Sequence, residues 1–221
     1  MGDLAGRPLV DVRINGKGPY PFILDTGASV TVVSPDVLAD VGLGDGTEPA
    51  RLDQLQIGDA ILHDVKVARL PVLGGRGGAS APRGVLSALA FSGYLTTIDF
   101  PRRLVTNRRG ALPPPDGKRV FEYPESEILP VVPVRVAGRE YRIHVDSGAQ
   151  GGLTLPTKYQ DDLPLDGPRG ACRSDGRITL SCVSPVISLP LSSPFRSVPR
   201  SSRSAAGKAR RSSQARSVRP A

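Results

Sequence analysis

Two short segments of this chain place a carboxylate, a hydroxyl and a glycine in a row. Asp25, Thr26 and Gly27 form the first, and residues 146–148 repeat the pattern as Asp-Ser-Gly. Each segment follows an alternating apolar pattern, which predicts a strand. Because glycine allows backbone geometries closed to other residues, each segment predicts a tight loop that presents its carboxylate at a strand end.

Two such loops, if they face each other, bring two carboxylates together. A pair of close carboxylates resists double ionisation, so the two share one proton. The ionised member can take a proton from a water molecule between them, and the protonated member can polarise a carbonyl group. The pattern therefore indicates general acid–base hydrolysis that needs no metal, no cofactor and no covalent intermediate.

The two segments lie within an internal repeat. Residues 9–35 and 131–156 both begin with alternating apolar residues, turn at a glycine and run into a second strand that ends in the Asp. Pro35 and Pro156 each follow their Asp by ten residues, and the copies are offset by 121 residues. We expect each copy to be a small β domain of about 100 residues.

The first copy continues with further β patterning. A turn at Gly58-Asp59 separates two apolar-patterned runs and predicts a hairpin. Beyond it we expect four segments: a glycine-containing loop over 73–83, a short helical stretch over 84–89, a final strand over 95–100 and a linker over 106–127. The second copy has no counterpart of these elements after Asp146, because the alternating pattern fades after Leu165.

Composition limits the other classes of protein. The chain has 25 Gly and 22 Pro among 221 residues, which favours short elements and many turns. It contains no apolar run long enough to span a bilayer and no visible N-terminal signal peptide, which predicts a soluble protein. If the N-terminus is incomplete, an exported or periplasmic protein is expected instead.

The positive charge is confined to the last quarter of the chain. Residues 166–221 contain 11 Lys and Arg against 2 Asp and Glu, whereas the rest is nearly balanced, at 18 against 19. Residues 167–221, rich in Arg, Ser and Pro, predict a disordered tail with weak, nonspecific anion binding. Aromatics that could stack on bases are missing apart from Phe195, so no specific nucleic-acid partner is expected.

Other chemistries have little support in the sequence. The two cysteines, Cys172 and Cys182, both lie in the tail and predict neither a disulfide nor a metal site. His63 lies in an expected turn. The glycine-rich run 74–78 lacks the following Lys and Ser/Thr of a phosphate-binding loop.

The residues from Val10 to Ser34 resemble the retropepsin-like aspartic proteases, and most closely the bacterial aspartyl protease family whose members often have tandem lobes. Gly84-Val85-Leu86, followed by residues 97–101, is similar to the C-terminal part of that lobe. The resemblance covers residues 8–106 and, in part, 129–165. Ser87 stands where the family usually has a glycine.

The resemblance implies an all-β chain built around a retropepsin-like acid protease β-barrel lobe. Lobe 1 would occupy residues 1–106 and a linker residues 107–128. An incomplete second lobe of the same type would occupy residues 129–166, and the basic tail would follow. A reading-frame shift near residue 167 is one explanation for the truncation, and translation of the other two frames would test it.

The resemblance also implies roles for individual residues. Asp25 and Asp146 would be the catalytic pair, and Thr26 and Ser147 would link the two loops by hydrogen bonds. The loops would be shaped by Gly27 and Gly148, and the floor of the substrate groove would contain Ala28 and Ala149. From strand periodicity, His144 shares the face of Asp146, so it is either a groove residue or a surface histidine.

The function implied is that of an aspartic endopeptidase, active at acidic pH, which binds an extended peptide as an added strand. Two forms of the active unit remain open. Asp25 and Asp146 pair within one chain, or two copies of lobe 1 form a homodimer with two Asp25 residues. An alternative of another class is a catalytically inactive module that binds peptides in the same groove.

Overall fold

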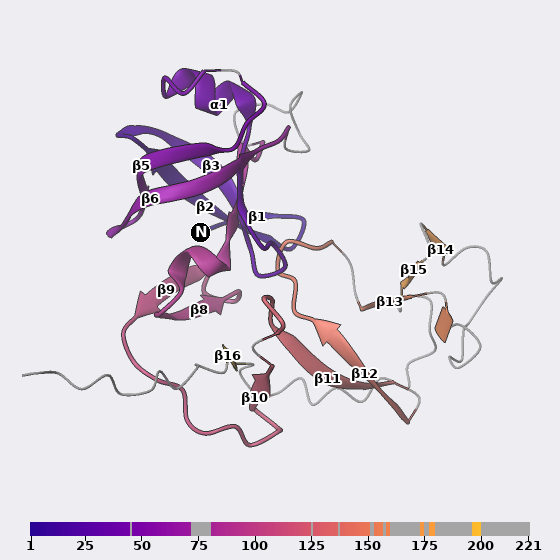
Figure 1. The fold of residues 1–221 in the computed structure, drawn as a ribbon. Helices are drawn as coiled ribbons and strands as arrows, with labels where there is room; N and C mark the ends of the chain where they lie inside the picture. Colours follow the sequence, from indigo (N-terminus) through magenta and orange to yellow (C-terminus); the bar gives the residue numbers. More distant parts are fainter. Residues whose placement is uncertain are drawn as a thin grey trace, which may run out of the picture.

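The computed structural model describes residues 1–44, 46–71, 81–124, 126–136, 138–150, 153–156 and 158–159, and the backbone alone of 173–174, 177–179 and 196–199. These residues form mainly short strands, with one short α-helix (Figure 1). The first copy contains β1 (Gly2–Leu4), β2 (Arg7–Ile14), β3 (Lys17–Asp25), β4 (Thr31–Val33), α1 (Pro35–Asp40), β5 (Ala50–Ile57), β6 (Ala60–Arg69), β7 (Gly84–Ser87) and the 3-10 helix η1 (Ala88–Phe91).

Six of these strands close into a barrel. Their order is β2-β3-β7-β4-β6-β5, and β5 pairs back onto β2, while β1 pairs with β2 outside the ring. β7 lies between β3 and β4, parallel to the first and antiparallel to the second. The expected all-β, retropepsin-like lobe is therefore confirmed, and β5 and β6 form the predicted hairpin around Gly58-Asp59.

The barrel interior explains why these segments become strands. Along β2, the alternating residues Val10, Val12 and Ile14 are buried, and β3 adds Phe22 and Leu24. Because side chains alternate across a strand, this period-two pattern turns one face of each strand inward. The rest of the buried cluster comes from the other strands, α1 and η1: Val33, Val37, Leu38, Leu52, Leu55, Val67, Leu86 and Phe91.

The structure corrects two predictions and places a third element outside the barrel. His63, expected in a turn, lies within strand β6 opposite Gln54. The expected helical stretch over 84–89 is wrong in its first half, because residues 84–87 form strand β7 and the helix begins only at Ala88. Hydrogen-bonded neighbours on both sides of β7 decide this. The strand expected over 95–100 exists as β8 (Leu95–Asp99), but it pairs with β9 (Leu104–Arg108) in a separate hairpin.

The second copy is smaller. β10 (Val120–Tyr123) precedes a hairpin of β11 (Val131–Val136) and β12 (Arg139–His144), and β13 (Thr154–Pro156) follows. In the described part of the chain, its separate cluster has three buried residues, Val136, Tyr141 and Leu155. Its sheet is thus far less enclosed than the barrel of the first copy.

Three short strands fall within the segment for which the sequence predicts a tail. β14 (Arg173–Ser174) and β15 (Arg177–Thr179) extend β13, and β16 (Arg196–Pro199) pairs in parallel with β10. The other residues beyond 159, including both cysteines, lie outside the described residues, as does the glycine-rich run 74–78.

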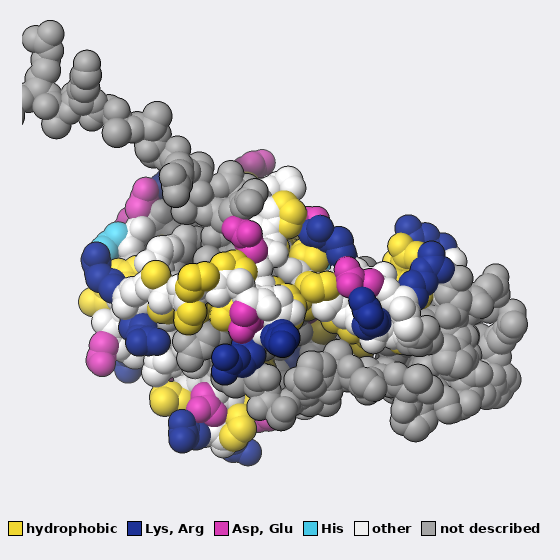
Figure 2. All heavy atoms as spheres, turned by 90° about the horizontal axis from the view of Figure 1, so that it is seen from below, with side chains coloured by type: hydrophobic (Ala, Val, Ile, Leu, Met, Phe, Trp, Pro, Cys, Tyr) yellow, Lys and Arg dark blue, Asp and Glu magenta, His cyan; other side chains and the backbone are white. Residues whose placement is uncertain are grey.

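The described surface is mixed in character. On the face drawn in Figure 2, basic side chains lie among acidic and apolar ones. Over the described ranges, no helix has the length and apolar character that a membrane span requires.

The contact between Gly84 and Phe22 yields a stability prediction. A Cβ at residue 84 would overlap the Phe22 ring, which is fully buried against the core. We expect Gly84→Ala to lower the free energy of unfolding by about 2 kcal/mol, the usual cost of overpacking, as measured by urea titration. Gly46→Ala is the control, because a Cβ there meets no atom within 4 Å. Equal stability of the two variants would contradict this packing.

Candidate active site

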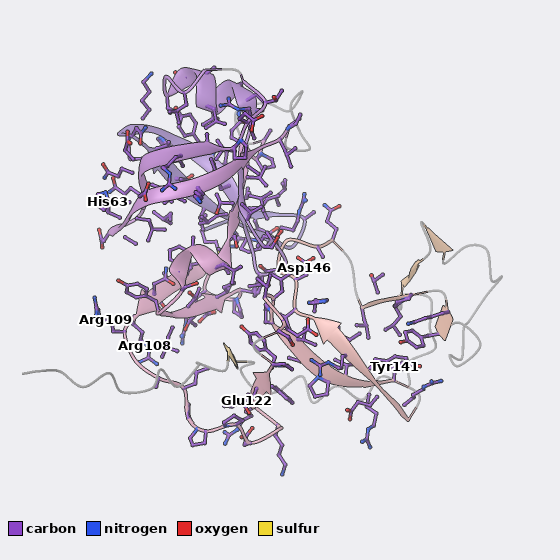
Figure 3. The ribbon with its side chains drawn as sticks, viewed as in Figure 1. His63, Arg108, Arg109, Glu122, Tyr141 and Asp146 are labelled. Atoms are coloured by element: carbon purple, nitrogen blue, oxygen red, sulfur yellow. The ribbon has the colours of Figure 1, made fainter. Side chains whose placement is uncertain are left out.

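Two loops from distant parts of the chain meet at one place. Asp25 is the last residue of β3, and Asp146 lies two residues beyond the end of β12. Figure 3 shows Asp146 on the loop that leaves β12 toward the first copy. Strand β3 is held by β2 on one side and by β7 on the other, so the first loop leaves a fixed strand end.

Four reciprocal hydrogen bonds join the loops. The Thr26 hydroxyl donates to the Val145 carbonyl (2.6 Å), and the Ser147 hydroxyl donates to the Leu24 carbonyl (2.8 Å). The Thr26 hydroxyl also accepts from the Ser147 N–H (3.0 Å), and the Ser147 hydroxyl accepts from the Thr26 N–H (3.1 Å). Each loop therefore fixes the backbone of the residue just before the Asp of the other loop. The same two bonds occur in both directions, so the hydrogen bonds follow a two-fold pattern within one chain.

The glycines allow the carboxylates to approach. A Cβ added at Gly27 would lie 2.5 Å from Cγ and 2.7 Å from Oδ2 of Asp146. A Cβ added at Gly148 would overlap the Asp25 carboxylate in the same way. Any side chain at either position would displace the carboxylate of the opposite loop, so the need for glycine at both positions is steric.

Each carboxylate is also oriented by its own loop. The Gly27 N–H donates to Asp25 Oδ1 (2.6 Å), and the N–H groups of Gly148 and Ala149 donate to Asp146 Oδ1 (2.8 and 2.9 Å). Burial raises the pKa of Asp25 to about 6, with contributions from the charge and side chain of Asp146. The backbone donors Gly27 and Ala28 oppose this rise in pKa. Asp146 is the more exposed member of the pair.

The structure brings most of the predicted site residues together. Asp25, Asp146 and the flanking hydroxyl residues and glycines are joined by the contacts above, and Ala28 and Ala149 lie in the two loops. His144 is exposed at the end of β12, opposite Val131. Among the described residues, no hydrogen bond or ion pair joins it to either Asp. Its place in a substrate groove stays a prediction.

Two polar residues in contact with the first loop were not predicted as part of the site. Ser87 and Thr31 are buried, and both hydrogen-bond to the loop or to its supporting strand. A signal for Ser87 exists in the sequence, because it is a polar residue directly after the apolar pair Val85-Leu86.

The two carboxylates are not part of a larger cluster of potential metal ligands in the described residues. Within the described ranges, no group of three or more His, Cys, Asp or Glu side chains is arranged to hold a metal ion. Two close carboxyls that share one proton are, in general, an arrangement suited to acid–base chemistry.

Comparison with known proteins identifies a family over the first copy. Residues 10–90 match the family described as aspartyl protease, a span that runs from within β2 to within η1 and includes Asp25. The match confirms the family resemblance over this part of the chain and supports a protease-type function in general. No curated protein matches the chain.

The raised pKa of Asp25 predicts a pH-dependent stability difference. The folded state binds this proton more tightly than the unfolded state, so the stabilisation is complete below about pH 4 and is lost as the pH rises through about 6. Asp25→Asn removes this dependence. We expect the variant to gain stability relative to wild type between pH 4 and pH 7, by about 1 kcal/mol after solvent screening.

Thermal melts at the two pH values measure this difference. The exposed Asp11, whose Asn variant should show no such gain, is the matched control. A difference between Asp25→Asn and wild type that does not change with pH would contradict the raised pKa of Asp25.

The reciprocal hydrogen bonds predict coupling between the loops. We expect Thr26→Val and Ser147→Ala each to lower the free energy of unfolding by about 1 kcal/mol. In a double-mutant cycle the two effects should be non-additive by about 1 kcal/mol, because each variant already breaks bonds that the other residue shares. Urea titration of the four proteins tests this. Additive effects would mean that the two hydroxyls act independently.

Proposed function

Since residues 10–90 form a lobe of the aspartyl protease type, we propose that the chain is an aspartic endopeptidase whose active site combines Asp25 with Asp146 of the same chain. The observation that supports this most directly is the reciprocal bonding of Thr26 and Ser147, which holds the two carboxylates face to face. The second carboxylate then comes from the incomplete copy, and no second chain is needed.

The proposed reaction is hydrolysis of a peptide bond. The ionised carboxylate takes a proton from water while the oxygen of that water bonds to the peptide carbon, and the protonated carboxyl donates to the carbonyl oxygen. Transfer of a proton to the peptide nitrogen then allows the C–N bond to break, which leaves one carboxylic acid and one amine. The burial and raised pKa of Asp25 favour it as the holder of the shared proton, with Asp146 as the base.

Site-directed removal of each carboxyl tests the proposal. We expect the full chain to cleave unstructured peptides below about pH 6, where the pair keeps its proton, and to lose activity above that pH. Asp25→Asn and Asp146→Asn should each lower kcat by at least about 10³-fold, because either change removes the acid–base pair. Asp11→Asn, on the exposed face of β2, should leave kcat unchanged.

The other outcomes identify the alternatives. Loss of cleavage in Asp25→Asn alone would show that the active unit is a homodimer of first lobes. A wild type that binds peptides without cleaving them at any pH would favour the inactive binding module. The small core of the second copy and the exposure of Asp146 would explain such a result.

A further inference from the structure

Ser87 is a buried polar residue at the edge of the candidate site. It is the last residue of β7, only 2% exposed, and it lies opposite Asp25 in the parallel register of β3 and β7. A buried hydroxyl is costly unless it is hydrogen-bonded, so its partners indicate why it is tolerated there.

The hydroxyl of Ser87 is used both as donor and as acceptor. It donates to the Ala28 carbonyl at 2.6 Å and accepts from the Leu89 N–H at 3.1 Å. The second bond caps the start of η1, which is packed through Phe91 into the barrel core. The first loop is thereby tied, at Ala28, to a rigid element of the barrel.

The backbone of Ser87 holds the other end of the same loop. Its N–H donates to the hydroxyl of Thr31 at 3.2 Å, and Thr31 is the first residue of β4 and only 4% exposed. The loop between β3 and β4 is therefore fixed at Ala28 and at Thr31 by one residue.

Ala28 connects this anchor to the carboxylate. Its backbone N–H favours the ionised form of Asp25 and so opposes the rise in the pKa of that carboxyl. Fixing the carbonyl of Ala28 also restrains the neighbouring Gly27, whose N–H donates to Asp25 Oδ1 at 2.6 Å. The charge that acts on Asp25 from the opposite loop is that of Asp146. On β2, the cation Arg7 is bonded to the Leu4 carbonyl (3.3 Å).

We propose that Ser87 is a positioning residue for Asp25, acting through the hydrogen bond of its hydroxyl to the Ala28 carbonyl. The expected effect of Ser87 on turnover rests on the proposed function. Its effect on the titration of Asp25 follows from the hydrogen bonds alone.

Ser87→Ala in the full chain tests this, with Ser34→Ala as the matched control. Ser34 is also buried, at 7% exposed, but its hydroxyl has no hydrogen-bond partner among the described residues. We expect Ser87→Ala to lower kcat about ten-fold, because a loosened loop misplaces the carboxylate, and to leave KM within about two-fold. The high-pH limb of the rate profile should move to higher pH, since less ordered backbone N–H groups at Gly27 and Ala28 favour the ionised Asp25 less.

A second readout does not depend on activity. Carbon-13 NMR of the Asp25 carboxyl, followed against pH, should show a higher midpoint in Ser87→Ala than in wild type or Ser34→Ala. Ser87→Thr keeps the hydroxyl and should restore both the midpoint and kcat. If Ser87→Ala does not fold, Ser87→Cys, which fills the site with a weaker donor, gives the same comparison.

The outcomes separate the two proposals. A wild type without peptidase activity overturns the proposed function, while the NMR titration still decides the role of Ser87. A wild-type midpoint in Ser87→Ala, or an equal shift in Ser34→Ala, overturns the positioning role whatever the activity.

Discussion

The site depends on the exchange of hydrogen bonds between Thr26 and Ser147. Each hydroxyl donates to a carbonyl of the opposite loop and accepts an N–H from the opposite hydroxyl residue. The partners in these bonds lie 119 to 123 positions apart in the chain, so each bond joins the two copies. The geometry of the two carboxylates is therefore a property of the contact between the copies and not of either copy.

The other features of the site follow from this contact. Once the loops are joined, each glycine faces the carboxylate of the opposite loop, and only a residue without Cβ fits. Burial raises the pKa of Asp25, and the same closeness adds the charge of Asp146 to that rise. The first loop gains its rigidity from the barrel through Ser87, whereas the second leaves a hairpin with a much smaller core. The two carboxylates thus have similar partners but unequal environments.

The sequence was sufficient to predict the loops but not the elements that support them. The spacing of Asp25 and Asp146 within a repeat indicates a paired site, because the carboxylate, hydroxyl and glycine are adjacent in each copy. Residues 84–87 are different: a short apolar run suits a helix or a buried strand, and only the pairing of β7 with β3 and β4 decides. The hydrogen bond from Ser87 to Ala28 spans 59 positions, so no local pattern could reveal it.

The most direct test of an intramolecular pair is the stoichiometry of a statine-type transition-state peptide, measured by calorimetric titration of the full chain at acidic pH. A statine hydroxyl occupies the place of the attacking water, so it binds only where two carboxyls face each other. The account predicts one inhibitor per chain and loss of binding in Asp146→Asn. One inhibitor per two chains, with binding retained in Asp146→Asn, would contradict it.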